Sequence, residues 1–182
     1  MKLKTLMLAA TLFVPAAFAT NVTVGESIPA TSVADKGLLM LENDTFSYRN
    51  WNSSELKGKV YVLQVMAGRT SAIELNDHMV QAITEAQFPS ESFQMVTIIN
   101  TDDAIWGTAM FVKGAIEDNK RAHPYAEFVV DDSSKVHEFW QLEKESSAII
   151  ILNKQGKVLY VKDGAMNSDE VTQAIELIHT NS

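Results

Sequence analysis

The chain has 182 residues, of which 46% are hydrophobic and 21% charged, a balance that is ordinary for a globular protein with a buried core. It contains no cysteine, which excludes disulfides, thiol nucleophiles and thiolate metal sites. A net charge of −8 indicates no basic surface for phosphate groups, so we expect no binding to nucleic acid.

Residues 1–19 have the pattern of a secretory signal peptide. Lys2 and Lys4 precede an apolar stretch over residues 6–14, and a small-x-small cleavage motif ends at Ala19. The stretch is shorter than the ~20 residues that span a bilayer, so it does not indicate a membrane anchor. We therefore predict cleavage after Ala19 and a periplasmic chain over residues 20–182 that does not insert in the membrane.

The next segments predict a β-rich start followed by a strand, a loop and a helix. Residues 20–56 indicate an N-terminal β extension of one or two short hairpins. The nearly continuous apolar run over residues 60–66 predicts a strand covered on both faces. After a polar loop, Ser71 and Glu74 form a predicted capping box that opens one helix reaching Ala86. The apolar stripe of this helix consists of Leu75, Met79, Ala82, Ile83 and Ala86.

The second half of the chain predicts alternating elements and ends in a hairpin and a helix. Gly156 suits the positive φ of the hairpin turn, and Asn167 with Glu170 forms a plausible capping pair for the last helix. The expected elements are a strand at 93–99, a helix at 106–119, a strand at 128–130, a turn or short helix at 136–140, hairpin strands at 147–152 and 157–161, and a helix from about 167.

This order predicts an α/β fold in one domain over residues 20–182. A parallel start and an antiparallel finish give a central mixed sheet, and the intervening helices cover both of its faces. The expected architecture is a three-layer sandwich.

The same pattern resembles the thioredoxin-like superfamily, and more specifically the YtfJ family of exported bacterial proteins. The resemblance implies a periplasmic thioredoxin-like domain with an N-terminal β extension, in a family without an established biochemical role. The segments that carry it are WN at 51–52, AGRTSA at 67–72, NTDDA at 100–104, WQL at 140–142, ESSA at 145–148 and KDGA at 162–165.

The chain departs from redox-active thioredoxins at both of their signature positions. The resemblance places their Cys-x-x-Cys within residues 69–73, where no cysteine occurs. It places their cis-proline near Glu145 and Ser146, yet no proline follows Pro124, so we expect a trans bond there. Thiol–disulfide exchange and cysteine-based peroxide reduction are therefore excluded.

The loop that carries Arg69, Thr70 and Ser71 is the first candidate site. A helix N-terminus supplies N–H donors, and Arg69 could add a bidentate clamp for an anion or carboxylate. Alternatively, Ser71 only caps the helix and Arg69 pairs with an acidic neighbour.

Acidic loops are expected beside this candidate site. Asp102 and Asp103 follow the next parallel strand, and Glu145 and Ser146 approach from a third side in a thioredoxin-like arrangement. An arginine ringed by carboxylates is either a polar binding site or an internal salt-bridge network.

Three functions remain open from the sequence. The first is a non-redox module that binds an unknown protein partner or a small anionic ligand through the face around Arg69. The second is a thiol-independent enzyme that uses Arg69 and the loop carboxylates on a small anionic substrate, and the third is a purely structural subunit. The four histidines show no metal-ligand spacing, so we expect neither a metal nor a cofactor.

Overall fold

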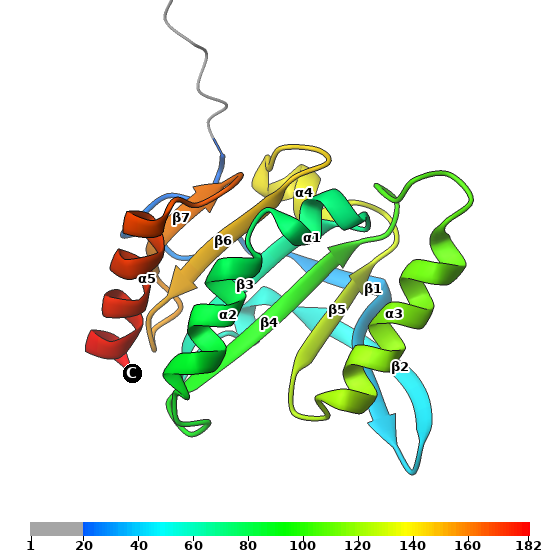
Figure 1. Cartoon of the computed structure of the whole chain (residues 1–182), viewed down its shortest axis with the longest axis horizontal. Coiled ribbons are helices and arrows are strands. Elements are labelled where there is room, and N and C mark those ends of the chain that lie inside the picture. Colours follow the sequence, from blue (N-terminus) through cyan, green and yellow to red (C-terminus); the bar gives the residue numbers. More distant parts are fainter. Residues whose placement is uncertain (1–19) are drawn as a thin grey trace, which may run out of the picture.

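The computed structural model describes residues 20–182, so the predicted signal peptide lies outside the described residues. Seven strands form one mixed sheet in the order β2-β1-β5-β4-β3-β6-β7 (Figure 1). The strands are β1 Ser32–Glu42, β2 Thr45–Asn52, β3 Val60–Ala67, β4 Phe93–Asn100, β5 Glu127–Asp131, β6 Ser147–Leu152 and β7 Val158–Asp163. The helices are α1 Thr70–Glu74, α2 Asp77–Ala86, α3 Ala109–Ala122, α4 Lys135–Trp140 and α5 Ser168–Asn181, with a 3-10 turn, η1, at Ser53–Glu55.

The sheet combines a parallel centre with antiparallel edges, as predicted. Strands β3, β4 and β5 run parallel, while β6 pairs antiparallel with β3 and β1 pairs antiparallel with β5. The predicted β extension is a single hairpin, β1–β2, turned by Asn43 and Asp44 in the left-handed conformation. Gly156 turns the β6–β7 hairpin with φ +77°, as the sequence predicts.

Helices cover both faces of the sheet, which confirms the three-layer sandwich. On one face Val60 and Val62 of β3 pack with Met79 and Ile83 of α2 and with Ile178 of α5. Helix α3 covers the β1–β5 side of the same face (Figure 1). On the other face of the sheet, the alternate side chains of β3, β4 and β6 pack with helix α4 and the N-terminal segment. Together they form the largest core cluster.

The single helix predicted from Ser71 to Ala86 is wrong, because the chain forms two helices there. Asn76 leaves the helical conformation, with φ −127° and ψ 21°, and its fully buried side chain turns into the core. The amide donates to the carbonyl oxygens of Ser147 at 3.1 Å and Gly164 at 3.3 Å. The predicted capping box is also wrong, since the N-cap of α1 is Arg69 and it makes no side-chain capping bond.

Two other helix starts show how local residues decide boundaries. Helix α3 begins at Ala109 rather than at Trp106, because Gly107 adopts φ +85° and Thr108 closes a turn onto the carbonyl of Ile105 at 3.0 Å. The predicted cap of α5 is confirmed: Asn167 and Glu170 form a complete capping box.

Candidate functional site

The candidate site lies where the carboxyl ends of β3, β4 and β5 meet. Gly68 follows β3 and donates its N–H to the carbonyl of Asn100, at the end of β4, at 2.8 Å. A Cβ atom at Gly68 would lie only 3.0 Å from the same carbonyl oxygen. Glycine therefore lets the two loops approach closely, which brings Arg69 over the loop after β4.

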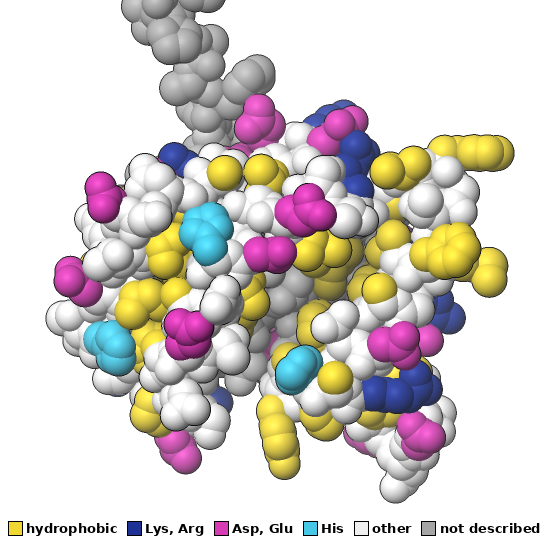
Figure 2. Space-filling view, in the orientation of Figure 1, with side chains coloured by type: hydrophobic (Ala, Val, Ile, Leu, Met, Phe, Trp, Pro, Cys, Tyr) yellow, Lys and Arg dark blue, Asp and Glu magenta, His cyan; other side chains and the backbone are white. Residues whose placement is uncertain are grey.

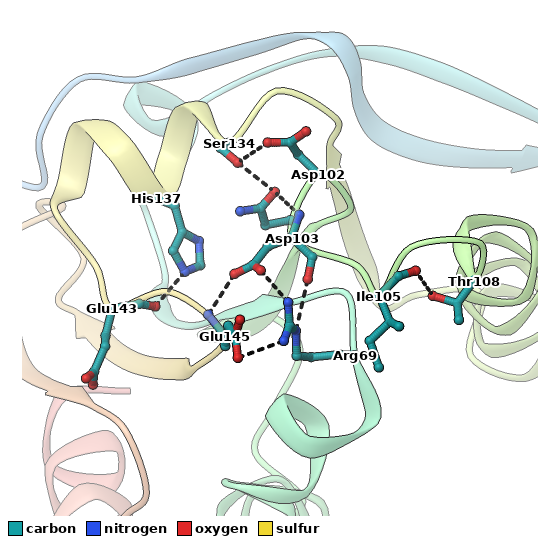
Figure 3. A network of polar contacts seen from close by, with 10 residues as sticks. Arg69, Asp102, Asp103, Ile105, Thr108, Ser134, His137, Glu143 and Glu145 are labelled. Atoms are coloured by element: carbon teal, nitrogen blue, oxygen red, sulfur yellow. Dashed lines mark hydrogen bonds and ion pairs between the residues drawn. The ribbon is translucent and has the colours of Figure 1, made fainter.

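The guanidinium of Arg69 joins three segments of the chain. Its Nε donates to the backbone carbonyl of Asp103 at 3.0 Å, and Nη2 donates to Asp103 Oδ1 at 2.6 Å. Its Nη1 pairs with Glu145 Oε2 at 2.9 Å (Figure 3). Each of the three nitrogens thus makes one contact within the protein, and the contacts of Nη1 and Nη2 are charge-assisted pairs with two different carboxylates.

The two carboxylates differ in how firmly they are held. The side chains of Arg69 and Asp103 are each 15% exposed, whereas that of Glu145 is 68% exposed. Asp103 Oδ2 also accepts the backbone N–H of Glu145 at 2.7 Å, and the backbone N–H of Asp103 donates to Asn100 Oδ1 at 3.3 Å. The Arg69–Asp103 pair is therefore a largely buried cross-link, whereas Glu145 pairs with Arg69 from the solvent-exposed side.

The other predicted site residues do not join this cluster. Asp102 turns to the opposite side and accepts a hydrogen bond from the Ser134 hydroxyl at 2.9 Å. Ser146 is buried, and its hydroxyl contacts Asp163 at 3.4 Å. Thr70 and Ser71 are exposed on α1, which is only five residues long. The structure thus brings together Arg69, Asp103 and Glu145 and separates the remaining four.

An apolar groove beside Arg69 is the feature that sequence reasoning missed. It is a cavity of about 380 Å³ between α1 and α3, at the end of β3 and β4. Its lining consists mainly of apolar side chains, with few polar groups: Met66, Ala67, Gly68, Arg69, Thr70, Ile73, Ile99, Ile105, Thr108, Phe111, Val112, Ala115, Ile116, Asn119 and Phe128.

Large hydrophobic side chains are exposed in the lining of this groove, at Ile73, Ile105 and Phe111, and next to these residues in the sequence, at Trp106 and Met110. Ile105 is 58% exposed, Phe111 79% and Trp106 98%, and Ile73 and Met110 are exposed as well. Figure 2 shows hydrophobic side chains gathered on the side of the molecule where α3 lies. The adjacent apolar pairs at 105–106 and 110–111, which one helical stripe does not explain, were the available signal in the sequence.

The described part of the chain offers neither a membrane span nor a grouped metal site. Within residues 20–182 no helix is long and apolar enough to cross a bilayer. Over the same residues, no three side chains of histidine, aspartate or glutamate come together as ligands for an ion.

Fold comparison defines the class as thioredoxin-like. The chain is similar to the solution structure of a putative protein disulfide isomerase from Bacteroides thetaiotaomicron, with a TM-score of 0.63 and 15% identity over 91% of this chain and 93% of that one. It is also similar to a putative thiol:disulfide interchange protein DsbE from Chlorobium tepidum, with a TM-score of 0.58 and 13% identity over 89% of this chain and all of that one. At these identities the likeness shows the fold alone.

The sequence comparisons give the particular family. Residues 22–181 match the family described as "Bacterial protein of unknown function (YtfJ_HI0045)", and the chain belongs to that family. It is 46% identical over 154 residues to the "Uncharacterized protein YtfJ" of Escherichia coli K12, covering 85% of this chain and 84% of the relative. It is 38% identical over 168 residues to an "Uncharacterized protein" of Haemophilus influenzae, covering 92% and 91%. The resemblance seen in the sequence is confirmed.

The two departures from the redox-active thioredoxins have structural counterparts. Residues 69–73, where the cysteine pair would lie, contain the Arg69 cross-link and most of α1. The bond between Glu145 and Ser146 is trans, like every peptide bond of residues 20–182, and Glu145 adopts a left-handed φ of +59°. The chain therefore retains the fold around this site without its thiol chemistry.

Proposed function

We propose that this protein is an exported, non-redox binding module whose α1–α3 groove takes up an apolar side chain of a partner protein. The observation that carries the proposal is the apolar cavity of about 380 Å³ beside Arg69, open to solvent and lined by the exposed side chains of Ile73, Ile105 and Phe111. Exposed aromatic and methionine side chains are enriched at protein interfaces. Contiguous exposed apolar surface is otherwise rare on soluble monomers.

A protein partner fits this site better than a small anion. The Arg69 guanidinium already pairs with the carboxylates of Asp103 and Glu145 and uses three of its five N–H groups in these contacts, which makes it a weaker clamp for another carboxylate or a phosphate than an unpaired arginine. The first turn of α1 belongs to a five-residue helix, whose dipole is correspondingly small. The surface that remains available is mainly apolar, and Trp106 and Met110, which precede or follow its lining residues Ile105 and Phe111 in the sequence, are exposed as well.

Arg69 has a positioning role in this proposal. One wall of the groove includes Arg69 and Ile73, and the facing wall includes Ile105, two residues after Asp103. The two hydrogen bonds from Arg69 to Asp103 therefore fix the distance between the walls. A groove whose walls are held in place loses less conformational freedom on binding, which favours affinity.

The groove does not favour the enzymatic alternative. Its polar lining groups are those of Arg69, Thr70, Thr108 and Asn119, and it contains no carboxylate or imidazole. A general base must lie within hydrogen-bond reach of the reacting group, and these residues provide none. We therefore propose binding rather than catalysis.

Export is the second part of the proposal. It rests on the signal-peptide pattern of residues 1–19, with two lysines before an apolar stretch and a small-x-small cleavage motif. The absence of cysteine is compatible with an oxidising compartment, since no thiol is present to be oxidised there.

Site-specific photo-crosslinking in the bacterium tests the partner. A benzophenone amino acid at Phe111, in the groove, should form a discrete adduct with a protein, whereas the same group at Tyr125, which is even more exposed but lies outside the groove, should not. Filling the cavity by Ala115→Phe should abolish the Phe111 adduct, while Lys113→Phe, which adds the same ring outside the groove, should preserve it. An adduct that survives Ala115→Phe, or one that forms equally at Tyr125, would show that the groove is not the binding surface.

A further inference from the structure

Helix α3 presents one continuous stripe of side chains to the apolar groove. The residues of this stripe follow one another at spacings of one, three and four along the helix and its N-cap: Thr108, Phe111, Val112, Ala115, Ile116 and Asn119. From Phe111 to Asn119 the helix rises about 12 Å, at 1.5 Å per residue. The groove is therefore long enough for a segment of a partner chain, and not only for one side chain.

The floor of the groove offers no sheet edge to an extended partner. Met66 and Ala67 belong to β3, Ile99 to β4 and Phe128 to β5. In the sheet order each of these three strands has a neighbouring strand on both sides. A partner that adds a strand to a sheet needs the unpaired N–H and C=O groups of an edge, so strand addition does not occur at this floor.

The polar side chains of the lining are largely engaged within the chain. The guanidinium of Arg69 makes its three contacts there, Thr108 Oγ1 donates to the carbonyl of Ile105 at 2.6 Å, and Asn119 Nδ2 donates to the carbonyl of Ala115 at 2.8 Å. An extended segment would lose the hydration of its backbone N–H and C=O groups here and gain few partners. A helix bonds these groups to one another, so the lining favours a helix.

The α3 wall of the groove carries a glycine in its interior. Gly114 lies one turn after Met110 and Phe111 and precedes the exposed Ala115. A Cβ atom at Gly114 would meet no atom of residues 20–182 within 4 Å, apart from its chain neighbours and the backbone of its own helix. Glycine destabilises a helix interior relative to alanine, and the packing of the folded chain does not require it at this position. The close approach of a second helix would account for it.

The rim of the groove is acidic on both walls. Glu74 is exposed at the end of α1, and none of the ion pairs of residues 20–182 involves it. Asp118, one turn after Ala115 on α3, is 81% exposed, while the exposed cations Lys113 and Arg121 already pair with carboxylates of this chain. Figure 2 shows acidic side chains on both sides of the hollow between α2 and α3. Basic side chains on a partner complement this rim and the net charge of −8.

We propose that the occupant of the groove is an amphipathic helix of a partner protein, with large apolar side chains at positions i, i+3 or i+4 and i+7 and with basic side chains beside them. This inference rests on the proposed function and adds the secondary structure and the charge of the partner to it. The competing occupants are an extended segment of a partner and a second copy of this chain.

The spacing of photo-crosslinks along the partner distinguishes a helix from an extended segment. A benzophenone amino acid is placed at Phe111 or at Asn119 in the full chain in the bacterium, and the crosslinked peptides are sequenced by mass spectrometry. A helix that lies along the groove should carry the two adducts about seven to nine residues apart, because it rises as slowly as α3 does. An extended segment rises about 3.3 Å per residue, so its adducts would lie about three or four residues apart.

The outcomes separate the failure of this inference from the failure of the proposed function. A separation of three or four residues would overturn the helix and leave the partner groove in place. Adducts with a second copy of this acidic chain would overturn the basic partner. If neither probe formed an adduct, the groove would not be a binding surface, and both proposals would be overturned.

A charge reversal on the rim tests the basic side chains of the partner. Glu74→Lys should lower the yield of the Phe111 adduct about threefold or more, through repulsion between like charges. Glu91→Lys makes the same change in net charge on the turn before β4, outside the lining of the groove, and should leave the yield unchanged. An unchanged yield with Glu74→Lys, or equal losses in the two variants, would overturn the basic partner.

Discussion

At the scale of single residues, the side chain of Asn76 connects three segments that are far apart in the sequence. It donates to the carbonyl oxygens of Ser147 and Gly164 and accepts the backbone N–H of Met166 at 3.2 Å. These partners lie on β6, after β7 and before α5, and Asn76 itself is fully buried. The side chain thus adds a second hydrogen bond to the Ser147 carbonyl, which also accepts the backbone N–H of Gly164, and provides partners for the Gly164 carbonyl and the Met166 N–H.

We expect Asn76→Ala to lower the free energy of unfolding by about 2–4 kcal/mol, because it removes the hydrogen-bond partners of the Gly164 carbonyl and the Met166 N–H and one of the two partners of the Ser147 carbonyl. Urea unfolding followed by circular dichroism measures the change. Asn119→Ala is the control, since this exposed amide bonds only within α3, and we expect a change within about 0.5 kcal/mol. Similar losses in the two variants would contradict a special role for Asn76.

The Arg69 cluster should divide into a strong and a weak pair. Arg69 and Asp103 are largely buried and share two hydrogen bonds, so we expect a coupling energy of about 1–3 kcal/mol. Glu145 is exposed, and its pair with Arg69 should contribute less than about 0.5 kcal/mol. Double-mutant cycles that combine Arg69→Met with Asp103→Asn or with Glu145→Gln measure both energies by urea unfolding. A larger coupling for Glu145 would reverse this assignment.

At the scale of elements, the sequence predicts those strands and helices whose residues carry a strong periodic or capping pattern. The apolar run of β3, the hairpin around Gly156 and the capping box of α5 all form as expected, because each depends on neighbours in the chain. The division of the predicted first helix does not follow from the sequence, since it depends on distant partners of Asn76. The cross-link of Arg69 was foreseen as one of two alternatives, but the groove was not, because it needs the packing of α3 against the sheet.

Strand β5 provides a test of how burial affects ionisation. Burial raises the pKa of Glu127, the first residue of β5, above its usual 4.5, although Arg49, Lys120 and Lys59 act in the opposite direction. The folded protein therefore holds the proton more tightly than the unfolded chain. Stability gained in this way is present below pH 4.5 and is lost as the pH rises through the raised pKa.

Glu127→Gln should therefore stabilise the protein relative to wild type more at neutral pH than at about pH 4. Glu170→Gln is a control of opposite sign, because hydrogen bonds from Lys162 and from the backbone of Asn167 lower the pKa of Glu170. The contribution of Glu170 is present above pH 4.5 and is lost as the pH falls through the lowered pKa, so its substitution should be more harmful at neutral pH. Urea unfolding of the three proteins at both pH values gives the two differences, and differences of the same sign would contradict the assignment.

At the scale of the whole molecule, the thioredoxin-like sheet is retained while its redox position is occupied by an ionic cross-link. Arg69 joins the loops after β3 and β4 and the segment before β6, at the edge where the resemblance places the cysteine pair. The same cross-link lies between two cavities. Arg69 lines the apolar groove, and Asp103 lines a second, polar cavity beside α4. Two chemically different surfaces therefore share one support.

The N-terminal segment covers the face of the sheet on which α4 lies, and it does so from Thr20, the first described residue. Thr20 Oγ1 donates to the carbonyl of Trp140 at 2.7 Å, and the backbone N–H of Asn21 donates to the same oxygen at 3.0 Å. Val22 is buried in the core cluster that contains Trp140. The segment that remains after the predicted cleavage is thus anchored on α4 from Thr20 onward.

Under the proposed export with cleavage after Ala19, we expect the mature protein to begin at Thr20, and we expect a chain that begins at Thr23 to lose about 2–4 kcal/mol of unfolding free energy. The loss combines the burial of Val22 with the hydrogen bonds of Thr20 and Asn21 to α4. Mass spectrometry of periplasmic protein identifies the first residue, and urea unfolding measures the stability. A chain with one methionine before Thr20 is the control and should be as stable as the exported form, because it retains every anchor. An exported protein that begins beyond Val22 would contradict the predicted cleavage site, and unchanged stability of the shortened chain would show that the segment does not support α4.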